Sequence, residues 1–156
     1  MLTVQIAKRA DGSGVLRCTR ADSSVTWQKQ TRHAMHFALH DLTHFAVEST
    51  LGYRRGFFGL IAEGWEIDDT TGKGSRGRLP EEAVEVEHIV GMFDTERGSG
   101  VLLTAEDFAS HAPRRLTDEE IVRVRTCRGE LLSRWYALEP GGTMELRFEY
   151  PQERRP

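Results

Sequence analysis

The sequence predicts an α+β fold, in which an N-terminal antiparallel β-meander is joined by a C-terminal strand and packs against four to five α-helices. Apolar and polar residues alternate near both ends of the chain, over residues 2–7 and 143–150. A period of two is typical of strands with one buried face. Between them, residues 32–52 contain no proline, are rich in alanine and leucine, and reach their first glycine only at Gly52. This composition favours a long helix, which we expect to be central and rich in histidine.

Four strands are expected, three at the start of the chain and one at its end. The alternating segment 2–7 leads into the turn ADGSG, whose glycines can adopt the positive φ of a tight hairpin. A second strand over 15–20 and a third over 25–29 flank the turn-forming run ADSS. The last strand, over 143–150, is apolar on one face only, so it needs a sheet to join. The only sheet predicted elsewhere in the chain is the N-terminal meander.

Helices are expected to fill the region between the strands. The long helix over 32–52 is followed by an apolar segment over 54–67, interpreted as a second helix, and by a glycine-rich loop over 68–80. A further helix begins at Pro80, because proline followed by two acids is favoured at a helix N-terminus. Two capping boxes then open a short helix and a long one that runs to Pro140. The residues of these boxes are Thr104 with Asp107, and Thr117 with Glu120.

Length and composition are those of a small globular protein. A chain of 156 residues is most simply a single domain, 1–156, and its 38% hydrophobic and 29% charged residues do not indicate disorder. A net charge of -3 gives no electrostatic reason to expect nucleic acid or an anionic membrane as partner. No apolar run is long enough to cross a bilayer, and the N-terminus is typical of a strand, not a signal peptide. We therefore expect a cytoplasmic protein that binds a small molecule or a peptide, in an oligomeric state that the sequence leaves open.

The two cysteines, Cys18 and Cys127, lack the close spacing of a metal-binding or redox pair. In a reducing cytoplasm, two free and buried thiols are expected. A disulfide between the two residues is the alternative that the sequence leaves open.

Histidines concentrate on one face of the long helix. At about 100° per residue, His33, His36, His40 and His44 fall within an arc of about 80°. Residues four apart on a helix stack above one another, so the rings of His40 and His44 can converge on one ion. Imidazole is a preferred ligand of zinc and of related metals. The sequence therefore predicts a metal site on this helix, with zinc as the expected ion.

The segment HDLTH, from His40 to His44, resembles the HExxH motif of zincin metallopeptidases, and HDLTHFAVE is most similar to the thermolysin branch. The resemblance implies that His40 and His44 are metal ligands. It also implies that Glu63, or alternatively Glu66, supplies the third ligand from the following helix. Asp41 stands where the family has its general base, with a side chain one methylene shorter than the family's glutamate. The function that this resemblance implies is hydrolysis of an amide or ester by metal-bound water.

Other donors near the histidine pair remain open as ligands. His36 and Glu48 lie one turn before and one turn after it, although side chains at i, i+4 and i+8 span about 12 Å and cannot easily share one ion. Glu85 and His88 form an E-x-x-H pair on the helix that begins at Pro80. We interpret their side of that helix as a solvated face. If instead it turns toward the histidine helix, Glu85 or His88 could complete the metal site.

A second class of function stays open beside the hydrolase. The chain could be a non-catalytic ligand-binding or protein-interaction domain in which the histidine cluster is structural. A closed coordination shell would favour this alternative, whereas an open position for water would favour an enzyme.

Overall fold

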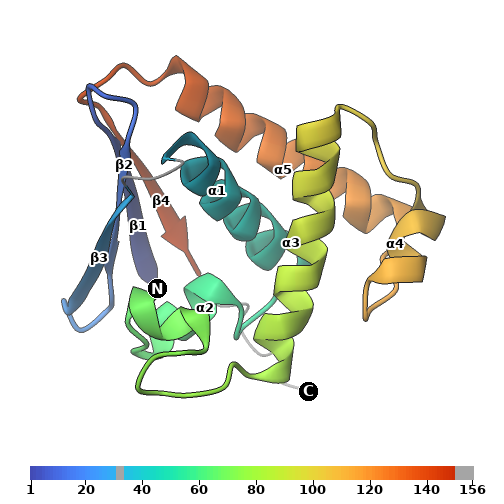
Figure 1. Cartoon of the computed structure of the whole chain (residues 1–156), viewed down its shortest axis with the longest axis horizontal. Helices are drawn as coiled ribbons and strands as arrows, with labels where there is room; N and C mark the ends of the chain where they lie inside the picture. The colour runs from blue at the N-terminus through green and yellow to red at the C-terminus, as the bar shows by residue number, and fades with distance from the viewer. Residues whose placement is uncertain (31–33, 150–156) are drawn as a thin grey trace.

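The chain forms a four-stranded antiparallel sheet with its helices gathered on one side (Figure 1). The computed structural model describes residues 1–30 and 34–149. The strands are β1 (Leu2–Lys8), β2 (Gly14–Thr19), β3 (Val25–Gln30) and β4 (Thr143–Phe148), in the order β3-β2-β1-β4. The predicted α+β fold, in which a C-terminal strand joins an N-terminal meander, is confirmed.

Strand β4 completes the sheet by pairing with β1. Val4 of β1 lies between Leu146 of β4 and Cys18 of β2, and all three side chains are buried. Because side chains alternate along a strand, this register turns the apolar residues of all three strands toward the helices. These inward-facing, buried residues are Leu2, Val4, Ile6, Leu16, Cys18, Met144, Leu146 and Phe148.

Five α-helices and a short 3-10 helix are present in the described part of the chain. They are α1 (Ala34–Leu51), α2 (Phe57–Glu63), the 3-10 helix η1 (Ile67–Thr71), α3 (Glu81–Ser99), α4 (Ala105–His111) and α5 (Asp118–Ala137). Helix α1 contacts β2, α2, α3 and α5, and in Figure 1 it lies between the sheet and α3. The central position predicted for the histidine-rich helix is therefore confirmed.

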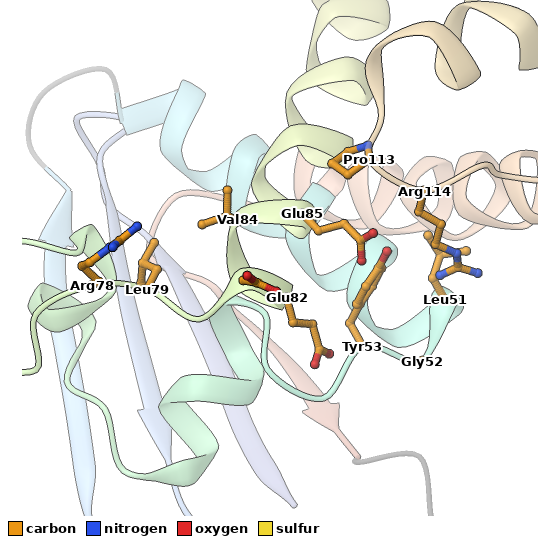
Figure 2. A pocket seen from close by; sticks show the side chains of 11 residues that line it. Leu51, Gly52, Tyr53, Arg78, Leu79, Glu82, Val84, Glu85, Pro113 and Arg114 are labelled. Atoms are coloured by element: carbon orange, nitrogen blue, oxygen red, sulfur yellow. The ribbon is translucent and has the colours of Figure 1, made fainter.

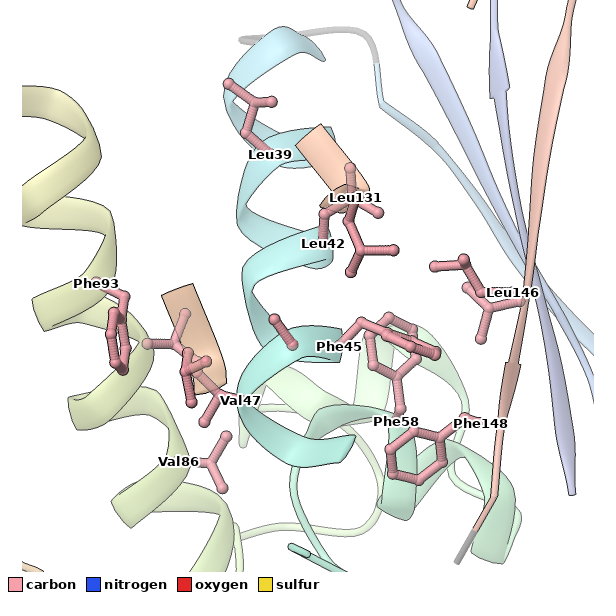
Figure 3. Packing of buried hydrophobic residues seen from close by; sticks show 14 of the residues in the cluster. Leu39, Leu42, Phe45, Val47, Phe58, Val86, Phe93, Leu131, Leu146 and Phe148 are labelled. Carbon is pink, nitrogen blue, oxygen red and sulfur yellow. The ribbon is translucent and has the colours of Figure 1, made fainter. Parts of the chain in front are cut away.

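Helix α1 packs through apolar side chains on two sides (Figure 3). Toward the sheet, Phe45 meets Phe148 of β4 and Phe58 of α2, with ring centroids 5.9 and 5.8 Å apart. On the side of α3, Val47 lies toward Phe93, and both residues are fully buried. Contacts on both sides fix the rotation of α1 about its own axis. They thereby fix the direction in which its histidines point.

The predicted second helix is shorter than expected. The segment 54–67 is interrupted at Gly64, which has a φ of 117° and caps α2 by donating its N–H to the preceding turn. Glycine adopts this left-handed conformation without strain and commonly ends helices. The chain then forms η1, which starts with a capping box at Glu66, so the predicted loop 68–80 begins inside a helical turn.

The predicted helix ends are otherwise confirmed. Gly52, after α1, has a φ of 75°, as a C-terminal glycine cap requires. Helix α3 begins directly after Pro80, and both predicted capping boxes form, at Thr104 for α4 and at Thr117 for α5. Each threonine side chain accepts a hydrogen bond from the backbone N–H three residues later. Among the described helices, none combines the length and the apolar character needed to span a membrane.

Both cysteines are free thiols, so the alternative of a disulfide between Cys18 and Cys127 is excluded. Cys18 is buried on β2, whereas Cys127 on α5 is only partly buried.

Candidate metal centre

Two histidines of α1 and one glutamate of α3 come together where these helices pack side by side. His40, His44 and Glu87 each offer a ligand atom, and these atoms all lie within 4.8 Å of one another. The two imidazole rings have centroids 4.8 Å apart and are nearly perpendicular, with an interplanar angle of 81°. Residues four apart on a helix stack in this way, so α1 alone brings the histidines together. Packing of α3 against α1 then brings the glutamate to them.

His44 is held between two carboxylates. Its Nδ1 donates a hydrogen bond to Glu48 Oε2 at 3.0 Å, and its Nε2 lies 3.0 Å from Glu87 Oε1. The His44 side chain is almost completely buried, while that of Glu87 is 45% exposed. The Nδ1 atom of His44 is thus held by the buried carboxylate of Glu48, and its Nε2 atom faces the partly exposed carboxylate of Glu87.

Glu48 connects the histidine to the second helix. Its side chain is completely buried. Its Oε2 receives the hydrogen bond from His44, and its Oε1 accepts hydrogen bonds from the backbone N–H groups of Phe58 and Gly59, at 3.0 and 3.3 Å. The start of α2 thereby uses a side chain of α1 to satisfy backbone donors that no residue of its own can pair.

His40 is oriented by a second carboxylate of α3. Its Nδ1 lies 2.5 Å from Asp94 Oδ2, and Asp94 in turn pairs with Arg97 one turn further along α3. The His40 side chain is 26% exposed, so this ring lies nearer the surface than that of His44. Each histidine of the pair therefore has its Nδ1 held by a carboxylate, from Glu48 or from Asp94.

These contacts shift the pKa values of the groups that make them. Burial of His44 disfavours its charged form, but hydrogen bonds to Glu48 and Glu87 outweigh this effect and raise the pKa of His44 to about 10. For Asp94, burial acts to raise the pKa, while the contacts with His40 and Arg97 prevail and lower it. The pKa of Glu87 is also lowered, because its pairing with His44 outweighs its partial burial. A metal-free site of this kind holds a proton on His44 at neutral pH.

The pair of histidines opens onto a pocket of about 230 Å³. Asp41, only 5% exposed, lines the same pocket as His40, His44 and Glu87. The remaining described lining residues are Gln28, Phe37, Phe57, Ile67, Thr70 and Thr71. None of these described residues is a lysine or an arginine, so apart from the two histidines the pocket walls are apolar, uncharged polar or acidic.

The structure brings Glu87 to the histidine pair in place of the predicted third ligands. Glu63 lies elsewhere, with its carboxylate paired with Arg55, 3.0 Å from Arg55 Nε. Glu66 begins η1, and its half-exposed carboxylate lies 3.5 Å from Arg20. Helix α2 ends at Glu63, and the chain beyond it hydrogen-bonds to β3 through the backbone N–H of Ile67.

The other predicted donors have different positions. Glu48 touches His44 but binds it from the Nδ1 side, as a hydrogen-bond acceptor. The side chain of His36 lies outside the described residues, as does all of His33. One alternative was that α3 lies beside the histidine helix and that Glu85 or His88 completes the metal site. Helix α3 does pack against α1, but the residue that it brings to the histidines is Glu87. Glu85 lines a different pocket, and His88 is exposed.

Sequence reasoning missed Glu87 and Asp94, although a signal for them exists. The two residues are seven apart and so lie within about 20° of each other on α3. They flank the buried stripe that includes Val86 and Phe93. Acidic residues at the edge of a buried stripe, two turns apart, are placed to reach across to a neighbouring helix.

Comparisons with protein-family models, with curated proteins and with solved structures find no match for this chain. The similarity to zincins therefore rests on the HDLTH motif alone.

Proposed function

We propose that the protein binds a divalent transition-metal ion, with zinc as the expected metal, through His40, His44 and Glu87. The observation that carries the proposal is the convergence of their three ligand atoms within 4.8 Å, in the wall of one pocket. Two imidazoles and one carboxylate form a donor set that zinc uses in catalytic sites. Ligands about 2.0 Å from a tetrahedral ion lie about 3.3 Å apart. The 3.0 Å between His44 Nε2 and Glu87 Oε1 is close to this spacing.

The carboxylates behind the two rings support the same proposal. Histidines that bind metals usually donate their other N–H to a carboxylate or carbonyl, which fixes the tautomer and makes the ligand more basic. Glu48 and Asp94 are in position to do this for His44 and His40. Because Nδ1 of each ring is engaged in this way, we assign Nε2 of each ring to the ion.

The proposed reaction class is hydrolysis of a small amide or ester. A zinc ion with three protein ligands keeps one position for water and acidifies the water bound there. Asp41 lines the pocket beside the three ligands and is the residue that we assign to accept the proton. The aromatic walls formed by Phe37 and Phe57 suit an apolar group on the substrate. The lack of lysine and arginine among the described lining residues disfavours phosphate esters.

A second candidate function is structural. His44 between Glu48 and Glu87 makes a hydrogen-bonded network without any ion, since a protonated imidazole can donate to both carboxylates. In this case the histidines would stabilise a non-catalytic ligand-binding or interaction domain. The two candidates differ in whether the purified protein carries metal.

Metal analysis of protein purified without a histidine tag tests the proposal. We expect about one equivalent of zinc or a related metal per chain. Glu87→Gln and His44→Ala should each lose most of it, because each removes one of only three protein ligands. Glu63→Gln is the matched control, since Glu63 is the ligand that the motif predicts and it pairs with Arg55 instead. Metal-free wild-type protein that takes up no added zinc would overturn the proposal and favour the structural candidate.

The variant Asp41→Asn tests whether the proposed metal ion has a catalytic role or only a structural one. If Asp41 accepts the proton, the variant should retain the metal and lose at least about a hundredfold in hydrolysis of aryl esters. Equal activity of the variant and the wild type would remove Asp41 from the mechanism.

A further inference from the structure

The sheet has one open face. In Figure 1 the described helices all lie on one side of the sheet, which leaves the other side open. We call this open side the outer face. It consists of the odd-numbered residues of the four strands, within 3–7, 15–19, 25–29 and 143–147, which alternate with the residues that face the helices. None of these residues lines the pocket of the metal centre.

Trp27 is the aromatic residue of the outer face. Its side chain is 63% exposed, whereas those of Trp65 and Trp135 are 6% and 2% exposed. Among the described strand residues, Trp27 is the only large hydrophobic side chain that is exposed. Aromatic side chains on open sheets serve as stacking surfaces for unpaired nucleobases. An exposed indole ring on the outer face is placed for the same contact.

Three basic side chains share the outer face. Arg17 on β2 lies directly opposite Trp27. Lys29 follows two residues further along β3, and Arg147 lies on β4. All three are exposed, and within the described part of the chain none of them forms an ion pair. Because Glu145 is the only acid in the four strands, the outer face carries an excess of positive charge.

This positive excess is local to the outer face. The chain as a whole has a net charge of -3, and this average gave no reason to expect nucleic acid as a partner. Acidic residues gather elsewhere, for example at the pocket beside α3 in Figure 2, where Glu82 and Glu85 lie with Arg78 and Arg114 of the same chain. On the outer face, by contrast, the basic groups are left for an anionic partner from outside.

The three basic residues follow a diagonal across the sheet. Neighbouring strands lie about 4.8 Å apart, and residues two apart on a strand lie about 7 Å apart. The observed register therefore places the backbones of Lys29 and Arg17 about 8 Å apart, and those of Arg17 and Arg147 about 12 Å apart. Thr3 and Gln5, on β1 between Arg17 and Arg147, add uncharged hydrogen-bonding groups. This arrangement suits a partner that is extended, anionic and polar.

Two other occupants fit the outer face less well. A second copy of the chain in a symmetric pair would place the same positive excess against itself, which is unfavourable. An anionic bilayer attracts basic groups, but stable binding at its surface also requires buried apolar area, and Trp27 is the only large apolar side chain exposed here.

We propose that the outer face binds single-stranded nucleic acid. In the proposed complex an unpaired base stacks on Trp27, and phosphate groups of the strand lie against Arg17, Lys29 and Arg147. Phosphate contacts supply affinity that does not depend on sequence, and stacking adds a preference for single strands over duplexes. Bound nucleic acid would lie on the side of the sheet that faces away from the helices and the proposed metal centre.

Fluorescence anisotropy of a labelled oligodeoxythymidine of about twelve nucleotides, titrated with the full chain at low salt, tests the proposal. We expect saturable binding, weaker binding of a duplex of equal length, and quenching of the Trp27 fluorescence by the unlabelled strand. The logarithm of the association constant should fall with the logarithm of the salt concentration with a slope of about -2, because each of three phosphate contacts contributes about -0.7.

Variants of the outer face test the two kinds of contact separately. Trp27→Ala should weaken binding about tenfold, because the stacking contact is lost. Arg17→Gln should weaken binding and reduce the size of the salt slope by about 0.7. Arg115→Gln and Tyr136→Ala are the matched controls, since they change an exposed arginine and an exposed aromatic residue outside the sheet, and they should leave the affinity unchanged.

Several outcomes would overturn the proposal. They are the absence of saturable binding at low salt, equal affinities of Trp27→Ala and the wild type, and tighter binding of the duplex than of the single strand. Binding to phosphatidylserine vesicles without binding to the oligonucleotide would assign the outer face to a membrane surface instead. A dimer in analytical ultracentrifugation that Trp27→Ala abolishes would assign it to a second copy. All of these results are independent of whether the histidine site holds a metal.

Discussion

At the scale of single residues, burial changes the chemistry of groups that look ordinary in the sequence. His44 and Glu48 are both almost completely inaccessible to solvent, and each satisfies the other through a hydrogen bond. Glu63 has the same side chain as Glu48, but it lies at the surface in an ion pair with Arg55, which contributes little to stability. Four residues of sequence separation are enough to pair His44 with Glu48. Glu63 lies instead on α2, where its carboxylate is turned to Arg55.

Cys18 allows a test of burial that is separate from the metal site. Its burial between sheet and helices raises the pKa of its thiol from 9.0 to about 12. Below pH 9 both the folded and the unfolded state keep the thiol proton. Between pH 9 and 12 only the unfolded state loses it, so the free energy of unfolding should fall as pH rises, by up to about 1.4 kcal/mol per pH unit.

Chemical denaturation between pH 8 and 11 measures this effect, with Cys18→Ala as the control that lacks it. Alkylation at pH 8.5 gives a second measurement, because native protein should react at the half-buried Cys127 and keep Cys18 protected. Equal alkylation rates for the two thiols in folded protein would contradict the assigned burial.

At the scale of elements, the packing of α3 selects the third candidate ligand. Helix α3 is joined to α5 by Glu96, which is 2% exposed and pairs with Arg125 and Arg128. It is joined to α1 by apolar contacts that include Phe93. These contacts fix the rotation of α3, and a rotation by one residue, about 100°, would replace Glu87 with a different side chain. The E-x-x-H pair of Glu85 and His88 belongs to the face that this packing turns away.

Gly56, before α2, makes the close approach of Glu48 possible. A Cβ at this position would lie 2.5 Å from Glu48 Cδ, which is closer than any stable contact. We expect Gly56→Ala to destabilise the protein by about 1–3 kcal/mol, because Glu48 would have to leave its hydrogen bonds with α2. Urea denaturation of the variant measures this loss.

Gly91 is the matched control, since a Cβ added there meets no other atom within 4 Å. Because Gly91 is an exposed residue inside α3, Gly91→Ala should stabilise the protein by about 0.5–1 kcal/mol. Two alanine variants of equal stability would show that the contact between Gly56 and Glu48 has no energetic weight.

At the scale of the whole molecule, the sheet and the helices are joined by one aromatic cluster. Phe148 of β4 contacts Phe45 of α1 and Phe58 of α2, and it is 1% exposed. Phe148 is about ninety residues or more from the other two in the sequence. The pairing of β4 with β1 places Phe148 there, so sheet pairing and helix packing depend on each other.

Replacing Phe148 by alanine should therefore cost about 3–5 kcal/mol of stability, through lost contacts and the cavity left behind. Thermal and urea denaturation monitored by circular dichroism would measure the loss. Trp27→Ala is the aromatic control, because Trp27 on β3 is 63% exposed and should change stability by less than about 0.5 kcal/mol. A similar loss in both variants would argue against Phe148 as the link between the two layers.

The sequence by itself determined most of the elements of this protein and two of the three candidate ligands, His40 and His44. Alternation defined β1 and β4, capping boxes defined the starts of α4 and α5, and the four-residue spacing of His40 and His44 brought two rings together. All of these follow from interactions within a few residues of the chain, or from a periodicity that a single element must satisfy.

Only the tertiary structure decided which carboxylates meet the histidines. Glu87 and Asp94 lie more than forty residues after the residues that they contact. Whether they arrive depends on the rotation and the position of α3, which its packing against α1 and its ion pairs with α5 set. The motif indicated Glu63 by analogy, but the left-handed glycine at residue 64 ends α2 and directs the chain to β3. A local pattern cannot contain that information, because it arises from contacts between segments distant in the sequence.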